Sequence, residues 1–474
     1  MEGWIRDWLD MQRARGERCL EVKKSGNNYY VYHSTTRYNR LTKKRDKVSS
    51  YLGTLDREKG VIRPKKGRVT GSNLRGVYEY GNSMVLHKMM EGLRSVLAEA
   101  FPAEWRELYA LALVRAQAYA PLKRAGVAWS KLYDPLAIQP DMAPSSLSRM
   151  LKRVGVDRKA QARVFKQLSV EGGELVYDLS AVYTQGSLNF AEKGYNKDHL
   201  FLPQINLALF CDARSGLPTM IRCLPGSVRD VKSLYQSLRE VDMTDKTLIL
   251  DRGFFSDTSL RYFKSEGHNF VVPAWRNSRY YKLDFLVHAH FFYHDRLVHC
   301  TKKKVDGVFF YMYEDQDLQR DETRTLYRRL DAGQITLDVF ETEKKKAGRI
   351  LLASSLDRDE KSVFLLYKSR DRIEKLFDAY KNVLNADRLY LQDNETLFGH
   401  VFTSFLSLYA YANLQNLIKK AGLDDQYSPL DVLLLYSKVY LLELEDGSLV
   451  TDTPKRVEEI DKALSLNIFP KTRS

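Results

Sequence analysis

The spacing of apolar residues changes along the chain and predicts where helices and strands lie. From residue 83 to about 122, and again from 145 to 168, apolar residues recur every three or four positions, which indicates packed helices. Between 174 and 274, short runs of strand-forming residues alternate with helical stretches. The expected strands are 174–180, 205–211, 217–224, 247–250 and 269–274, and the expected helices are 228–241 and 257–266. This pattern predicts an α/β fold, a mixed sheet with helices against it.

The first 80 residues follow a different pattern. Residues 4–9 place tryptophan, isoleucine and leucine among charged side chains, which is typical of a short amphipathic helix and not of a signal peptide. Two aromatic and β-branched runs between residues 20 and 56 flank a basic turn, so a β-hairpin with a cationic tip is expected. The tip could grip phosphates, but basic residues also keep an edge hairpin soluble.

Two short basic helices are expected near the end of the region 81–170. Ser145 could cap the first, Gly155 would end it, and residues 158–168 would form the second. The pair resembles a helix-turn-helix, although many helix pairs that bind nothing have the same pattern.

Beyond residue 274 the composition changes again. Residues 275–348 are aromatic and basic, which predicts a strand-rich insertion, and a strand returns at 349–355. The apolar run 401–418 contains several polar residues, so it predicts a buried helix and not a membrane span. The remainder, 418–474, is expected to be helical.

Residues 366–381 predict a helix with a chemically unusual stripe. At about 100° per residue, offsets of three, seven and fourteen return to nearly the same face. Tyr367, Arg370, Glu374 and Lys381 therefore share one face, and apolar residues occupy the adjoining one. Such a face suits an anionic partner and a metal. A solvated helix with an Arg370–Glu374 ion pair is the simpler explanation of the spacing alone.

Composition restricts the class of protein. The chain has 474 residues, of which 44% are hydrophobic and 28% charged, as expected of a soluble protein with several structural units. Its formal charge of +15, from 75 Lys and Arg against 60 Asp and Glu, predicts attraction to a polyanion such as nucleic acid. The four cysteines have no metal-binding or disulfide spacing, which fits a reducing cytoplasm.

Three carboxylates have a claim to chemistry. Asp178 lies inside an apolar strand, where an unpaired charge costs several kcal/mol. Asp251 follows a strand and precedes Gly253, a common way for a sheet to present an acid at its carboxyl edge. With Glu374 on the later helix, these acids can converge and bind Mg²⁺ or Mn²⁺ through oxygen. Two such ions roughly 4 Å apart can promote in-line attack at phosphorus.

These motifs resemble those of a known family. Tyr367, Arg370, Glu374 and Lys381 match the spacing Y-x2-R-x3-E-x6-K, the signature of the DDE transposases of bacterial and archaeal insertion sequences, in the large superfamily conventionally numbered four. The sequence from Asp251 to Ser256 is similar to the second-aspartate motif of that family, and residues 177–180 are similar to the first. The resemblance covers about 174–417 and is weaker in the N-terminal third.

The resemblance implies an RNase H-like catalytic core interrupted by a β-rich insertion. The expected regions are an N-terminal helix and hairpin unit, a helical DNA-end-binding region, the first part of the core, the insertion, the second part of the core with the signature helix, and a C-terminal helical dimerisation region. Their bounds are 1–80, 81–170, 171–274, 275–348, 349–417 and 418–474.

The resemblance also implies a function and roles for residues. The expected enzyme binds terminal inverted repeats as a homodimer, cuts double-stranded DNA with Mg²⁺ or Mn²⁺ at two ions per site, and joins the ends to target DNA, in a prokaryotic cytoplasm at the nucleoid. Asp178, Asp251 and Glu374 would be the catalytic metal ligands. Tyr367, Arg370, Lys381, Arg252, Lys375 and Trp275 would contact DNA, Trp275 by stacking on a flipped base. A nuclease without strand transfer, or an inactive DNA-binding protein, are the alternatives.

Overall fold

The computed structural model describes residues 2–26, 28–39, 44–57, 60–62, 74–169, 173–184, 188, 190–193, 203–228, 231–241, 243–387, 389, 391–445 and 447–469. The chain divides into two compact units. The first is Met1–Arg75 with Leu444–Asp446, and the second is Gly76–Glu443 with Gly447–Ser474. The first boundary therefore lies at Arg75, near residue 80, where the sequence analysis put it.

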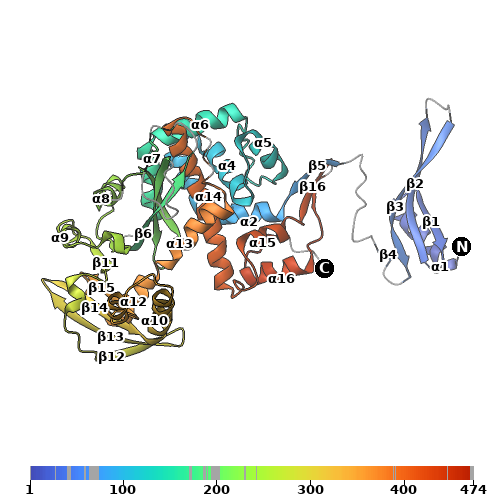
Figure 1. Ribbon diagram of the computed structural model, residues 1–474. Coiled ribbons are helices and arrows are strands. Elements are labelled where there is room, and N and C mark those ends of the chain that lie inside the picture. Colours follow the sequence, from blue (N-terminus) through green and yellow to red (C-terminus); the bar gives the residue numbers. More distant parts are fainter. Residues whose placement is uncertain are drawn as a thin grey trace. The chain divides into compact units, whose positions relative to one another are not determined.

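In the first unit a helix lies against an antiparallel sheet (Figure 1). Ile5 and Leu9 of the helix are buried with Val31 and Leu55 of the sheet. The helix and hairpin expected from the sequence are confirmed, whereas the hairpin tip at 40–43 lies outside the described residues. The elements are α1 (Gly3–Ala14) and the strands β1 (Leu20–Ser25), β2 (Asn28–Asn39), β3 (Lys44–Asp56) and β4 (Gly60–Ile62), which pair in that order.

The second unit begins with a helical region that shares one apolar core with the rest of this unit. Its helices are α2 (Gly81–Met89), α3 (Glu91–Ala100), α4 (Trp105–Gln117), α5 (Leu122–Lys131), α6 (Pro144–Val156) and α7 (Arg158–Leu168).

The α6–α7 pair corrects two details of the sequence analysis. Ala143, and not Ser145, caps α6, since Pro144 at the first helical position presets the helical φ. The helix also continues past Gly155 to Val156. A Cβ on Gly155 would lie 1.8 Å from the carbonyl oxygen of Glu395, so this glycine permits a close helix contact instead of ending the helix.

A mixed sheet with flanking helices is confirmed at the centre of the second unit. In the order β9-β8-β6-β10-β11, the first three strands are antiparallel and the last three are parallel. The strands are β6 (Glu174–Tyr183), β7 (Glu192–Lys193, beside β8), β8 (Pro203–Asp212), β9 (Pro218–Pro225), β10 (Thr247–Ile249) and β11 (Asn269–Pro273). Helix α8 (Val231–Glu240) leads from β9 to β10, and α9 (Asp257–Ser265) from β10 to β11.

The insertion is less purely β than the sequence suggests. Its strands β12 (Ala289–Tyr293), β13 (Arg296–Val305) and β14 (Val308–Asp315) were expected, but α10 (Gln316–Asp331) and α11 (Leu337–Lys344) were not. Leu326 is the buried side chain of α10, so this charged helix gives almost no apolar period. The strands extend the central sheet, because β15 (Arg349–Ser354) pairs with β14 on one side and with β11 on the other.

Helix α14 (Asn394–Lys420) runs through the core of the second unit, which confirms the buried helix expected at 401–418 (Figure 1). Ser407 Oγ donates to the carbonyl of Ala112 at 2.9 Å, and Phe405 packs edge-on against Phe165. Among the described residues, every helix is too short or too polar to span a membrane.

The sequence analysis expected the region beyond residue 418 to be helical, but this region also contains strands. Besides α15 (Pro429–Tyr436) and α16 (Lys455–Leu464), it contributes β16 (Tyr440–Leu444) and β17 (Gly447–Val450), which form a sheet with β5 (Leu74–Glu79).

Candidate active site

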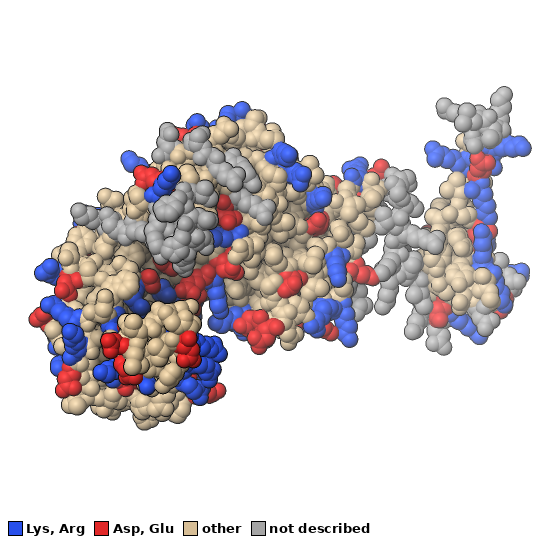
Figure 2. Space-filling view, in the orientation of Figure 1, with Lys and Arg blue, Asp and Glu red and all other residues tan. Residues whose placement is uncertain are grey.

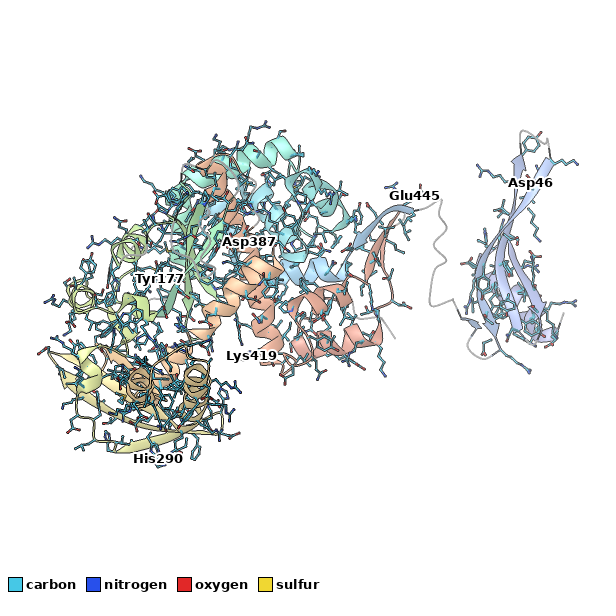
Figure 3. The ribbon with its side chains drawn as sticks, viewed as in Figure 1. Asp46, Tyr177, His290, Asp387, Lys419 and Glu445 are labelled. Atoms are coloured by element: carbon cyan, nitrogen blue, oxygen red, sulfur yellow. The ribbon has the colours of Figure 1, made fainter. Side chains whose placement is uncertain are left out.

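Asp178 lies within β6, and Asp251 lies two residues beyond the end of β10, the parallel neighbour of β6. Ile249 of β10 pairs with Val176 of β6, and each aspartate comes two residues further along its own strand direction. Continuing the register therefore sets Asp251 beside Asp178, on chains about 4.8 Å apart. Figure 3 labels Tyr177, the neighbour of Asp178, on β6. Both carboxylates are thus available to one site near the end of β10.

The segment that carries the third acid is not one regular helix. Helix α12 (Glu360–Lys368) ends before Ser369, α13 (Asp371–Asp378) begins after Arg370, and a π-helical turn, η4 (Ala379–Val383), follows. The expected helix is therefore present as two α-helical parts and a π-helical turn, and Ser369 and Arg370 between the first two parts keep right-handed helical backbone angles.

The two helices pack against partly different strands. Phe364 of α12 contacts the rings of Phe291, Tyr293 and Tyr313 on the insertion strands. Helix α13 instead packs against β6 and β8 of the central sheet. Helix α12 also contacts β11 of the central sheet, so both helices pack on that sheet and α12 packs on the insertion as well.

Arg370 joins the predicted acids. One guanidinium nitrogen donates to Asp251 Oδ1 at 2.6 Å, and the other donates to Glu374 Oε1 at 2.9 Å. The Arg370 side chain is only 19% exposed, against 43% for Asp251 and 56% for Glu374. Burial acts to lower the pKa of Arg370, but Tyr367, Asp251, Asp178 and Glu374 together raise it. All three acids therefore act electrostatically on one cation, and the i,i+4 ion pair expected from the sequence is present.

The other two signature residues flank this cluster. Tyr367 is partly buried, and burial together with nearby Asp251 raises the pKa of its phenol, so this phenol stays protonated near neutral pH. Lys381 Nζ donates to the carbonyl oxygen of Ala181 on β6 at 2.7 Å. The signature residues thus fasten the α12–η4 segment to the strand that carries Asp178.

The remaining predicted DNA contacts lie differently. The guanidinium of Arg252 lies 5.8 Å from the centre of the Trp275 ring, and Trp275 is 46% exposed, so this pair presents an aromatic face beside Asp251. Lys375 is exposed on α13, next to Glu374. Arg252 and Lys375 each adjoin one of the predicted acids in the sequence, and Trp275 lies against Arg252.

One positioning residue was missed in the sequence analysis. Arg372 donates to the carbonyl oxygen of Ala213 at 2.8 Å and also to that of Arg214, in the turn between β8 and β9. These bonds fix α13 to the sheet and so help to orient Glu374. The sequence does not predict these hydrogen bonds, because an arginine among charged helix residues is expected to be exposed to solvent.

The donor chemistry of the acids fits a divalent cation. Asp178, Asp251 and Glu374 offer only oxygen, which Mg²⁺ and Mn²⁺ prefer. Across the described part of the chain, however, no group of three His, Cys, Asp or Glu side chains is arranged to hold a metal ion. The positive charge among these acids is the guanidinium of Arg370.

Comparison with known proteins identifies the family. The model of the transposase DDE domain matches residues 172–410, just over half of the chain, and this range includes Asp178, Asp251 and Glu374. The chain belongs to the transposase DDE domain family. No curated protein matches its sequence.

Among solved structures, the cryo-EM structure of the piggyBac transposase synaptic complex with hairpin DNA aligns at 14% identity and a TM-score of 0.37. The alignment covers 82% of this chain and 76% of that chain. At this TM-score it supports no conclusion about the fold.

Proposed function

We propose that this transposase binds the terminal inverted repeats of a prokaryotic insertion sequence and moves it by cutting and joining DNA. Asp178, Asp251 and Glu374 are the catalytic acids of this proposal. The observation that supports it best is their convergence on Arg370, in a chain whose family model spans all three.

The central sheet would be the RNase H-like core of the enzyme. Its order β9-β8-β6-β10-β11, with antiparallel strands followed by parallel ones, brings the first two acids to neighbouring strands. Mg²⁺ or Mn²⁺, two ions per site, would supply activation of water or a 3′-hydroxyl and stabilisation of the leaving oxygen. The three carboxylates would hold these ions.

The residues around the acids would hold the DNA. Arg370 has two-pronged geometry that suits a phosphate, and Lys381 adds a point charge. Arg252, Lys375 and Tyr367 would extend this contact along the strand, and the exposed ring of Trp275 would stack on an extruded base. We propose a homodimer as the working form, assembled on DNA at the nucleoid of a prokaryotic cytoplasm.

The test is a cleavage and strand-transfer assay on the DNA that flanks the gene, with Mg²⁺. Asp178→Asn, Asp251→Asn and Glu374→Gln are each expected to abolish both reactions, because each removes a charged metal ligand. Asp378→Asn is the matched control. Asp378 is also an exposed acid on α13, and its bond from Asn382 can be kept by asparagine.

The outcome separates the candidate functions. Full activity of any one triad variant would overturn the role of that residue. Hydrolysed ends without joined products would favour a nuclease on the same core. No metal-dependent cleavage of flanking DNA by the unaltered chain would favour an inactive DNA-binding protein.

A further inference from the structure

Most of the net charge of the protein belongs to the N-terminal unit. Residues 1–75 contain 19 of the 75 Lys and Arg but only 8 of the 60 Asp and Glu, an excess of 11 out of the formal +15. The much larger second unit, which carries the acid cluster, is therefore close to neutral overall. A strongly basic unit of this size points to a polyanionic partner of its own.

The two faces of the N-terminal sheet differ. Helix α1 covers the face that carries Val22, Tyr29 and Val31, which pack with Ile5 and Leu9. Because side chains alternate along a strand, the residues between these point to the other face, which α1 leaves uncovered.

The uncovered face is aromatic and cationic. The ring of Tyr51 lies 6.0 Å from that of Tyr30 and 5.4 Å from that of Tyr32. Lys23 Nζ lies 4.8 Å from the centre of the Tyr32 ring, and Lys47 pairs with Glu21 at 2.7 Å. Tyrosines and cations interleaved on one sheet face present flat surfaces for bases and sugars with charges for phosphates.

Part of this face protrudes as a two-stranded ribbon (Figure 1). Strand β1 reaches β2 only as far as the Leu20–His33 pair. Beyond it, residues 34–39 of β2 pair with residues 44–49 of β3 alone. Figure 2 shows Lys and Arg side chains gathered along this ribbon. Two strands about 4.8 Å apart fit the major groove of B-DNA, which is about 12 Å wide.

On the ribbon, the uncovered face carries the cross-strand pairs Thr36–Lys47 and Tyr38–Arg45. Tyr38 is 57% exposed, and Arg45 is exposed. The opposite face of the ribbon carries the pairs Arg37–Asp46 and Asn39–Lys44, and Asp46 offsets one of its two cations. The uncovered face differs in combining its cations with the exposed ring of Tyr38.

We propose that the uncovered face of the N-terminal sheet binds double-stranded DNA, with the β2–β3 ribbon in the major groove. Tyr38 and Arg45 would contact base edges, and Lys23 and Lys47 would contact phosphates. The proposal rests on the proposed function in taking the ends of the element as the DNA that is read. Polar tips on every aromatic side chain of this face argue against a lipid surface, which would favour aliphatic side chains.

The test uses the full-length chain and short DNA duplexes with a randomised centre. Bound duplexes are recovered and sequenced, and the affinity of an enriched duplex is measured by fluorescence anisotropy at several salt concentrations. The variants are Tyr38→Ala and Arg45→Gln. Arg37→Gln is the matched control, because it removes a cation from the same ribbon on the face of Asp46, which Figure 3 labels.

The expected result is a loss of affinity of about tenfold or more for each variant, with weaker sequence enrichment, and little change for Arg37→Gln. Lys47→Gln should lower the slope of log affinity against log salt by about 1. Unchanged affinity of the Tyr38→Ala, Arg45→Gln double variant would overturn the proposal. The proposal would also be overturned if the chain bound a single-stranded oligonucleotide or anionic vesicles more tightly than duplex DNA and the double variant lost that binding.

This experiment tests the ribbon independently of the proposed catalytic function. The catalytic acids do not enter this measurement, because binding is measured without metal or cleavage. If the ribbon variants still cleaved the element ends with full activity, the proposed role of the acids would stand and the proposed role of the ribbon in reading those ends would be overturned.

Discussion

Arg370 and Asp251 are joined by a 2.6 Å ion pair that links the break between α12 and α13 to the end of β10. Glu374 accepts from the other arm of the same guanidinium at 2.9 Å. A cation built into the chain thus stands among the acids proposed to bind metal. Metal binding and this ion pair should therefore compete.

Removing the guanidinium should strengthen metal binding in the absence of DNA. Arg370→Gln is expected to raise the affinity for Mn²⁺ by about tenfold or more. The guanidinium would no longer compete with Mn²⁺ for the carboxylates, and about 1.4 kcal/mol of binding free energy corresponds to a factor of ten. Calorimetric titration or the electron paramagnetic resonance of free Mn²⁺ measures this without catalysis. Arg320→Gln on α10 is the control, because Arg320 pairs with Asp317 of its own helix and not with the proposed metal ligands. Equal affinity of Arg370→Gln and the unaltered chain would contradict the competition.

Lys381 should contribute one phosphate contact at the element end. Lys381→Gln is expected to weaken DNA binding and to reduce the slope of log affinity against log salt by about 0.9. An ammonium group has three protons, so Lys381 can keep its bond to Ala181 and still meet a phosphate. Lys419→Gln, at the exposed end of α14 and labelled in Figure 3, should leave the slope unchanged. A slope that Lys381→Gln does not alter would exclude the contact.

The crossing of α6 and α14 should not tolerate a single added methyl group. A Cβ on Gly399 would lie 1.9 Å from the carbonyl oxygen of Leu151, where backbone must move. Gly399→Ala is expected to lower the free energy of unfolding by about 2 kcal/mol or more. Gly92→Ala on α3 is the control, because its Cβ would meet no atom within 4 Å, and it should gain up to about 1 kcal/mol. Denaturant unfolding compares them, and equal stabilities would refute the contact.

Acid should destabilise the second unit through a buried histidine. Burial lowers the pKa of His400 from 6.5 to about 3, and its Nε2 lies 3.1 Å from the carbonyl oxygen of Ala386. Between these pH values the unfolded chain binds a proton that the folded chain does not. The free energy of unfolding therefore falls as pH falls from about 6.5 toward 3, by up to about 1.4 kcal/mol per pH unit.

The variant His400→Gln keeps a donor for Ala386 but cannot titrate, so its stability should depend less on pH over this range. His290→Gln, on the exposed surface of β12 and labelled in Figure 3, should follow the unaltered chain. His87, whose pKa burial lowers to about 4, adds to the slope in the same direction and remains in both variants. Parallel pH profiles for His400→Gln and the unaltered chain would contradict the assignment.

The central sheet and its acids were predictable because they depend on local pattern. A run of β-branched and apolar residues predicts a strand whichever other strand it pairs with. An acid that interrupts such a run, as Asp178 does, needs a polar or charged partner. Asp251 was predictable from the strand that it follows. The charged helix α10 was missed because a helix with one buried side chain carries almost no apolar period.

The structure of residues 366–381 was predicted only in part from the sequence. A regular helix satisfied every local preference, and the i,i+4 pair of Arg370 and Glu374 was expected and found. The interruption at Ser369 and Arg370 was not predictable, because both residues keep helical backbone angles and leave no mark in the local pattern.

The sequence by itself determined most strands of the central sheet, the basic N-terminal unit and the spacing of the three predicted acids, since periodicity, charge and motif spacing are properties of the chain alone. Only the tertiary structure decided that Asp251 follows the strand beside the one that carries Asp178 and that Arg370 stands among the acids. It also decided which face of the N-terminal sheet is uncovered. Strand register, helix packing and long-range ion pairs depend on residues distant in the sequence, and no local pattern encodes them.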